Sequence, residues 1–324
     1  MIQKSDDPVP NRYGKRPSDR TLGELLRNGA IVLDKPCGPT SHQVASWARD
    51  VMKIERIAHG GTLDPNVSGV LPIFVGKAVR LTDLMLSADK EYVCLMRLHR
   101  DRSEDEVRRM LSEFVGRIYQ FPPLRSAVKR QLRIRTIHSL DLLDIDGRDV
   151  LFRVSCDAGT YIRTLCIDIG EALGVGANML ELRRTRSGSM SEMEAVTLQQ
   201  LKDAYELWQE RGRPEPLYDI VRPVEDLISH LPRVVLKTAS VDAVCHGADL
   251  AVPGLAQYDE SIRKGGNVAM LTSRGELVAV GKAAISGERL KEAKRGIAVR
   301  TERVFMERGT YPRMWTFSTD LQRG

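Results

Sequence analysis

Residues 59–72 read His-Gly-Gly-Thr-Leu-Asp-Pro-Asn-Val-Ser-Gly-Val-Leu-Pro, and their single carboxylate, Asp64, stands directly before a proline. A residue that precedes proline is biased away from the α-helical region of backbone space. We therefore expect Asp64 to lie in a turn rather than on a helix face. Aspartate before proline is most often a turn or helix-capping residue, so catalysis has to be argued from further motifs.

The composition is that of a mildly basic globular protein. The length of 324 residues suits about two domains, and a net charge of +6 favours a polyanionic partner. The 5 cysteines are scattered, without paired spacing, which predicts reduced thiols and neither disulfides nor a metal site. The N-terminus lacks a signal-peptide pattern and no apolar run approaches membrane-spanning length, so we expect a cytoplasmic protein with no membrane partner.

Basic residues gather in three runs, of which the third, Lys291, Lys294, Arg295, Arg300 and Arg303, is diluted by acidic residues. The first run contains no acidic residue and consists of Arg125, Lys129, Arg130, Arg133 and Arg135. The second consists of Arg183, Arg184 and Arg186. A charge run is usually a solvated face, but the absence of acids from the first favours phosphate contact.

Hydrophobic periodicity predicts a mixed α and β protein with a largely antiparallel sheet. Residues 30–33 read as a buried strand, and the alternation over 150–156 as a strand with one buried face. Thr40 or Ser41 can cap a helix through about Met52. We expect its buried face to carry Val44, Trp47, Ala48 and Val51.

Residues 211–232 contain several prolines and charges and mark a domain boundary. Beyond them, short strands punctuated by glycines suggest a small all-β barrel.

Five sequence blocks carry a specific resemblance. They are Val32-Leu-Asp-Lys-Pro36 with Gly38-Pro-Thr-Ser-His42, the Asp64 segment, Lys90-Glu-Tyr-Val93, Gly159-Thr-Tyr-Ile-Arg163 and Leu182-Arg-Arg-Thr-Arg-Ser-Gly188. From about Leu25 to Trp315 the chain resembles the TruB-type RNA pseudouridine synthases, most closely the archaeal and eukaryotic dyskerin-like branch. That branch supplies the catalytic subunit of box H/ACA ribonucleoproteins.

The resemblance implies an α+β pseudouridine synthase fold, with a mainly antiparallel mixed sheet, followed by a small PUA barrel. The expected domains are an N-terminal extension over 1–30 that packs on the PUA domain, a catalytic domain over 31–228, a PUA domain over 233–310 and a disordered tail over 316–324. The implied partners are a box H/ACA guide RNA, substrate rRNA or tRNA, and small ribonucleoprotein subunits that include a kink-turn-binding protein.

The resemblance also assigns the site. The reaction breaks the N1–C1′ bond of uridine, turns the uracil and joins C5 to C1′; no redox change occurs, so no cofactor and no metal are expected. Asp64 matches the carboxylate that attacks the sugar or removes its 2′ proton. Arg163 matches the arginine that keeps this carboxylate ionised and aimed. Tyr92 matches the tyrosine that stacks on the flipped uracil and can act as the base.

Further positions match substrate-binding and RNA-binding residues of the family. Leu182 would close the uracil pocket, His59 would help to hold the flipped nucleotide, Tyr161 belongs to the same site, and Lys35 would brace the catalytic loop. RNA contacts are expected from Arg125, Lys129, Arg130, Arg133 and Arg184 and, in the barrel, from Gly247, Ala248, Asp249 and Leu250.

Three positions depart from the family pattern, which usually has Ser or Thr at Gly60, often Lys at Asn66 and Thr at Ser68. Gly60 would loosen the loop.

A stand-alone tRNA enzyme, which recognises a stem-loop directly, remains an alternative of the same class. A non-catalytic RNA-binding scaffold for ribosome assembly is the alternative from another class, and the set of Asp64, Tyr92 and Arg163 counts against it. A methyltransferase is disfavoured because no strand–glycine-rich turn–helix unit appears.

Overall fold

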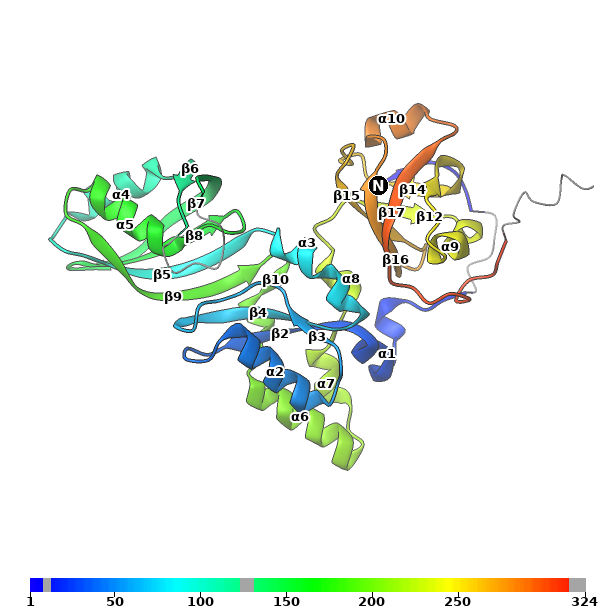
Figure 1. The fold of residues 1–324 in the computed structure, drawn as a ribbon, viewed down its shortest axis with the longest axis horizontal. Coiled ribbons are helices and arrows are strands. Elements are labelled where there is room, and N and C mark those ends of the chain that lie inside the picture. The colour runs from blue at the N-terminus through cyan, green and yellow to red at the C-terminus, as the bar shows by residue number, and fades with distance from the viewer. Residues whose placement is uncertain (8–12, 123–130, 315–324) are drawn as a thin grey trace, which may run out of the picture. The chain divides into compact units, whose positions relative to one another are not determined.

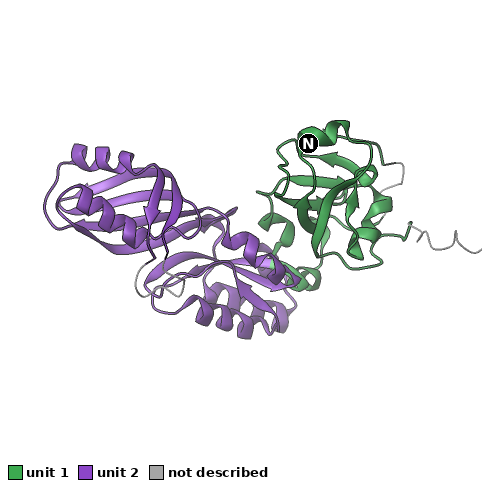
Figure 2. Ribbon diagram, turned by 45° about the horizontal axis from the view of Figure 1, so that its top comes forward, with its two compact units in different colours: residues 1–29, 222–324 green, residues 30–221 purple. Residues whose placement is uncertain are grey.

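The computed structural model of the protein describes residues 1–7, 13–122 and 131–314. The chain forms two compact units, of which unit 1 contains residues 1–29 and 222–324 and unit 2 contains residues 30–221 (Figure 1, Figure 2). Each unit has its own sheet and its own buried core. Within the described ranges, every helix is too short or too polar to cross a membrane.

Unit 2 is built on a mixed sheet in the order β2-β4-β9-β5-β8-β7-β6. Its strands are β2 (Asn28–Lys35), β4 (Val67–Gly76), β9 (Ala177–Ser187), β5 (Lys90–Leu98), β8 (Asp149–Cys156), β7 (Arg133–Asp146) and β6 (Gly116–Gln120), with β3 (Ile57–His59) beside β4 and β10 (Met190–Ser191) beside β9. The pairs from β9 to β6 are antiparallel, whereas β4 and β9 are parallel. The predicted mainly antiparallel mixed sheet is confirmed.

The helices of unit 2 are α2 (Ser41–Met52), α3 (Thr82–Leu86), α4 (Glu104–Glu113), α5 (Ile162–Ala172), α6 (Leu198–Arg211) and α7 (Glu215–Ile220), with short 3₁₀ helices η2 (Lys77–Leu81) and η3 (Glu192–Glu194). Three of the α-helices, α2, α4 and α6, begin at reciprocal capping boxes. Thr40 caps α2 through a reciprocal capping box with Gln43. The predicted start and end of this helix are confirmed.

The prediction that Trp47 lies on the buried face of α2 is wrong. Trp47 is 48% exposed, and Ala45 and Met52 are buried beside Val44 and Ala48. The buried stripe faces α6, and Trp47 lies beyond its edge because the stripe extends in the other direction around the helix.

The core beside the site lies between β5, β7 and β8 and the helices α4 and α5. Along β8, Val150, Phe152, Val154 and Cys156 are all fully buried. The predicted strand with one buried face is confirmed, because side chains alternate between the two sides of a sheet.

Unit 1 carries a second sheet, in the order β1-β14-β12-β15-β16-β17-β13. These strands are β1 (Ile2–Gln3), β14 (Leu255–Tyr258), β12 (Arg233–Leu236), β15 (Asn267–Leu271), β16 (Leu277–Ala283), β17 (Ile297–Val304) and β13 (Leu250–Ala251); the remaining elements are η1 (Pro17–Asp19), α1 (Leu22–Arg27), β11 (Arg222–Pro223), α8 (Val224–Leu227), α9 (Thr238–Cys245), η4 (Val252–Gly254) and α10 (Gly287–Glu292).

The N-terminal residues are attached to this C-terminal sheet. Strand β1 pairs with β14, and the buried Glu276 accepts hydrogen bonds from the Tyr311 hydroxyl (2.6 Å) and the Lys15 N–H (2.9 Å). Segments from the two ends of the chain therefore share one unit. The expected tail, 316–324, lies outside the described residues.

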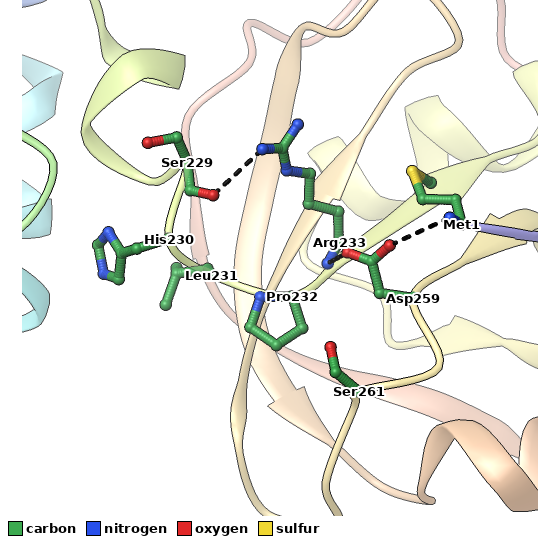
Figure 3. A pocket seen from close by; sticks show the side chains of 8 residues that line it. All are labelled: Met1, Ser229, His230, Leu231, Pro232, Arg233, Asp259 and Ser261. Atoms are coloured by element: carbon green, nitrogen blue, oxygen red, sulfur yellow. Dashed lines mark hydrogen bonds and ion pairs between the residues drawn. The ribbon is translucent and has the colours of Figure 1, made fainter.

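Unit 1 also contains a polar pocket of about 370 Å³ (Figure 3). Its wall is formed by Met1, Ser229, His230, Leu231, Pro232, Arg233, Asp259 and Ser261. Inside it, the Arg233 guanidinium donates to the Ser229 carbonyl (3.1 Å) and the Arg233 N–H to Asp259 (2.8 Å). None of the site residues proposed from the sequence lines this pocket.

Candidate active site

Asp64 lies in a turn that immediately precedes β4. Its carbonyl accepts a hydrogen bond from the Val67 N–H (3.0 Å), which closes the turn Asp64-Pro65-Asn66-Val67. Aspartate at the first position and proline at the second suit such a turn. The predicted turn is confirmed. The Asp64 side chain is 60% exposed, so its carboxylate is open to a substrate.

Arg163 reaches this carboxylate from the first turn of α5. Its Nη2 donates to Asp64 Oδ2 at 2.9 Å, across 99 residues of sequence. Half of the Arg163 side chain is exposed, so the pair adds little to stability. Its effect is to orient the carboxylate.

Gln120 sets the start of α5 and was not identified from the sequence. It is 2% exposed, and its amide accepts from the Tyr161 N–H (3.0 Å) and donates to the Tyr161 carbonyl (3.1 Å). Tyr161, the residue that precedes α5, is thereby bonded to the last residue of β6. This contact fixes the start of α5 and with it the position of Arg163. No local pattern marks this glutamine, because its partner is distant in sequence.

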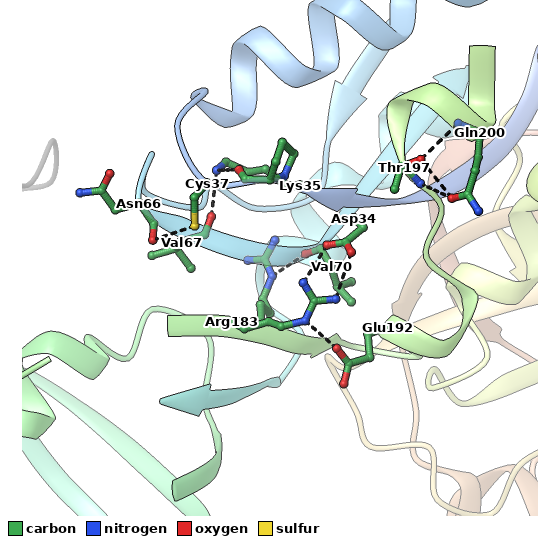
Figure 4. Close-up of polar contacts among 12 residues, drawn as sticks. Asp34, Lys35, Cys37, Asn66, Val67, Val70, Arg183, Glu192, Thr197 and Gln200 are labelled. Atoms are coloured by element: carbon green, nitrogen blue, oxygen red, sulfur yellow. Dashed lines mark hydrogen bonds and ion pairs between the residues drawn. The ribbon is translucent and has the colours of Figure 1, made fainter. Parts of the chain in front are cut away.

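Lys35 is bonded to the backbone of the turn that follows Asp64, and Figure 4 shows it near Asn66 and Val67 of that turn. Its fully buried ammonium donates to the carbonyls of Pro36 (2.8 Å), Pro65 (3.1 Å) and Val67 (2.8 Å). Burial lowers the pKa of Lys35, and the neighbouring Cys37 and Asp64 act in the opposite direction. One side chain thus joins the end of β2 to both ends of the Pro65–Val67 segment.

Ser41 fixes the residue that precedes Asp64. Its buried hydroxyl accepts from the Leu63 N–H (2.8 Å) and donates to the Leu63 carbonyl (3.1 Å). The sequence suggested Ser41 only as an alternative helix cap. Because Thr40 takes that role, the Ser41 side chain is free to hold the loop.

Tyr92 and Leu182 come from neighbouring central strands. Tyr92 of β5 is half-buried and pairs across the sheet with Arg184 of β9. Burial raises the pKa of the Tyr92 hydroxyl, whereas the positive charge of Arg184 acts to lower that pKa. Leu182 is half-buried and pairs with Val67 of β4. Val67 in turn follows Asp64 by three residues. The register of β4, β9 and β5 therefore gathers these side chains around one strand junction.

Arg184 corrects a sequence-based expectation. Instead of facing RNA it is 1% exposed, and it donates to the carbonyls of Val70 (2.7 Å) and Gly61 (3.1 Å). Arg183 is held by Asp34 and Glu192 (Figure 4), and Arg186 by Gly188 and Ser155. This run, which looked like a phosphate-binding cluster, is instead bonded to protein groups because strand β9 is central in the sheet.

His59 ends β3 and packs edge-on against His42, with ring centroids 4.6 Å apart. Burial, followed by the His42 charge, lowers the pKa of His59. Its Nδ1 is buried and has no hydrogen-bond partner among the residues that the structure describes. Burial and the neighbouring His42 therefore both favour the neutral imidazole of His59.

Gly60 corrects a second expectation. A Cβ at this position would lie 2.8 Å from Cζ of Phe74 and 3.0 Å from Cβ of Pro72. The glycine therefore permits close packing against β4 rather than loosening the loop.

The remaining predicted RNA contacts are divided. Arg125, Lys129 and Arg130 lie outside the described residues. Arg133 is half-buried on β7.

In unit 1, Gly247, Ala248 and Asp249 are exposed, and the last two bond Thr301. Leu250 is 1% exposed and belongs to the core. Its side chain therefore cannot serve as the expected RNA contact without leaving that core.

One group of side chains among the described residues has ligand spacing. Asp89, His138 and Asp157 place their ligand atoms within 4.8 Å of one another. His138 Nε2 lies 3.2 Å from Asp157 and 3.6 Å from Asp89, and Asp157 also accepts from the Thr136 N–H (2.7 Å). The contacts of His138 with the two carboxylates use the same atoms that a bound cation would take.

Comparison with known proteins identifies related sequences over the whole chain. Family models match residues 1–45 (DKCLD (NUC011) domain), 49–162 (TruB family pseudouridylate synthase, N terminal domain), 163–229 (tRNA pseudouridylate synthase B C-terminal domain) and 232–305 (PUA domain). "Probable tRNA pseudouridine synthase B" of Methanopyrus kandleri is 52% identical over 319 residues, which cover 98% of this chain and 94% of the relative. The protein of the same name from Methanothermobacter thermautotrophicus is 53% identical over 303 residues and 94% of each chain.

Solved structures agree. A chain in the crystal structure of a Cbf5-Nop10-Gar1 complex superimposes with a TM-score of 0.93, at 48% identity, over 96% of this chain and 95% of that one. A chain in an H/ACA RNP bound to a substrate RNA containing 2′-deoxyuridine gives a TM-score of 0.91, at 46% identity, over 97% and 96%.

The fold and the aspartate–arginine site define an RNA pseudouridine synthase. The chain belongs to the TruB family, and within it to the dyskerin-like branch, which the DKCLD and PUA matches distinguish.

Proposed function

We propose that this chain is the catalytic subunit of a guide-directed pseudouridine synthase, which isomerises selected uridines of ribosomal RNA. A box H/ACA guide RNA selects the uridine, and small protein subunits, among them a kink-turn-binding protein, complete the particle. The Asp64–Arg163 pair carries the catalytic part of the proposal. The similarity to chains crystallised in H/ACA and Cbf5-Nop10-Gar1 complexes supports the guided part.

Within this proposal the turn supplies the reacting group. Asp64 attacks C1′, or removes the 2′ proton, while the N1–C1′ bond breaks. Arg163 orients the carboxylate through its hydrogen bond. Tyr92 and Leu182 enclose the flipped uracil, and His59 contacts the nucleotide.

RNA binding is divided between two surfaces in this proposal. In unit 2 the basic run that includes Arg133 contacts phosphates. In unit 1 the exposed segment Gly247-Ala-Asp249 contacts the ACA end of the guide.

A second candidate is direct, guide-free modification of tRNA, which the names of the curated relatives favour. The two candidates differ in their need for guide RNA. Pseudouridine mapping after incubation with tRNA alone, and with guide, target RNA and partner proteins, distinguishes them. If the enzyme is guided, only the uridine that the guide RNA selects should be modified. Modification of tRNA alone at full rate would support the second candidate.

The first test of catalysis is Asp64→Asn, which preserves shape and removes the charge. We expect pseudouridine formation to be abolished while RNA affinity stays within about twofold, because the exposed carboxylate is not needed for the fold. Asp50→Asn, at an exposed aspartate on α2, is the matched control and should retain full activity. Near wild-type turnover by Asp64→Asn would remove the catalytic assignment.

A further inference from the structure

Arg184 is a buried cation that no part of the proposed function uses. It is 1% exposed, and burial lowers the pKa of its guanidinium. Burying a charge is costly unless the charge is hydrogen-bonded. A neutral residue would avoid this cost, so the position of its partners is informative.

The guanidinium of Arg184 is hydrogen-bonded to the chain on both sides of Asp64. Nη2 donates to the carbonyl of Gly61, three residues before Asp64, and Nε donates to the carbonyl of Val70 in β4, six residues after it. Both flanks of the Asp64 segment are thus attached to one rigid planar group.

The same side chain faces Tyr92. The two residues are direct partners across β9 and β5, so their side chains emerge on the same side of the sheet. Each of the two groups favours the ionised form of the other, whereas burial raises the pKa of the Tyr92 hydroxyl and lowers the pKa of the Arg184 guanidinium. Lys90, the neighbouring buried cation, instead donates to the carbonyls of Met85 (2.9 Å) and Ala88 (2.5 Å).

We propose that Arg184 is a positioning residue of the isomerisation: it fixes the Tyr92 hydroxyl relative to the Asp64 turn and stabilises negative charge on that hydroxyl. This inference rests on the proposed function, because it requires that Tyr92 contact the uridine. Arg184 touches neither base nor sugar. It acts through Tyr92, and its fixed donors cost no reorganisation during the reaction.

The test is a double-mutant cycle of Arg184→Lys and Tyr92→Phe, measured as single-turnover rates on pre-bound RNA. Lysine keeps the charge and loses the fork that bonds several acceptors at once. We expect Arg184→Lys to slow the chemical step by roughly tenfold to a hundredfold, as for loss of a hydrogen bond to a charged group. In the Tyr92→Phe background the same change should cost less than about threefold.

The matched control is Arg183→Lys, the adjacent arginine of β9, whose guanidinium bonds Asp34 and Glu192 instead. Its rate should stay within about twofold of wild type. Ultraviolet titration of the phenolate band, as the difference between wild type and Tyr92→Phe, provides a readout without turnover. In Arg184→Lys this difference should move to higher pH.

The outcomes separate the two proposals. If the wild-type particle forms no pseudouridine, the proposed function fails. If the wild-type particle is active but Arg184→Lys costs the same factor with and without the Tyr92 hydroxyl, Arg184 is only a loop brace and the inference is overturned. An unchanged phenolate titration in a folded Arg184→Lys protein would also overturn it.

Discussion

The hydroxyl of Ser41 is expected to be a main support of the catalytic turn, and Ser41→Ala tests this. The substitution leaves the Leu63 N–H and carbonyl without their buried partner. An unsatisfied buried group costs about 1–3 kcal/mol, and the better helix propensity of alanine returns at most about 0.5 kcal/mol. The cap of α2 is unaffected because Thr40 provides it.

The loss should appear locally as well as globally. Unfolding of a protein with two units need not be two-state, so hydrogen exchange of a peptide that contains Leu63 is the primary assay. We expect faster exchange there, and a lower single-turnover rate because Asp64 is less well placed. Ser46→Ala is the control, since Ser46 lies on the same helix and its hydroxyl accepts from the exposed Arg49 side chain (3.0 Å). If Ser41→Ala and Ser46→Ala exchange and react alike, the Ser41 hydroxyl does not hold the turn.

Two further predictions concern packing and charge near the site. Gly60→Ser should destabilise unit 2 by about 1–3 kcal/mol, because its Cβ would overlap Phe74; thermal unfolding measures this, and an unchanged melting temperature would contradict it. Burial lowers the pKa of Lys90 to about 8 from 10.5, so between these pH values the unfolded chain binds the additional proton and stability from this residue rises with pH. The free energy of unfolding of wild type minus that of Lys90→Met should therefore rise by up to about 1.4 kcal/mol per pH unit in this window and stay level below it; a difference that is flat across the window would refute the burial argument.

The sequence predicted what depends on neighbours along the chain. The capping residue of α2, the alternation along β8 and the turn at Asp64 are local signals and agree with the structure. The assignment of Asp64, Tyr92 and Arg163 came from a family resemblance, because isolated residues of these types have commoner structural roles.

Tertiary structure alone decided which polar groups face inward. The sequence shows one basic run, Arg183, Arg184 and Arg186. Because β9 is a central strand, Arg184 is buried and its guanidinium bonds backbone carbonyls inside the protein. Ser41 and Gln120 hold the site through partners that are 22 and 41 residues away. Local sequence fixes backbone conformation, but the burial of a side chain and its hydrogen-bond partners depend on contacts between distant segments, which exist only once the sheet has formed.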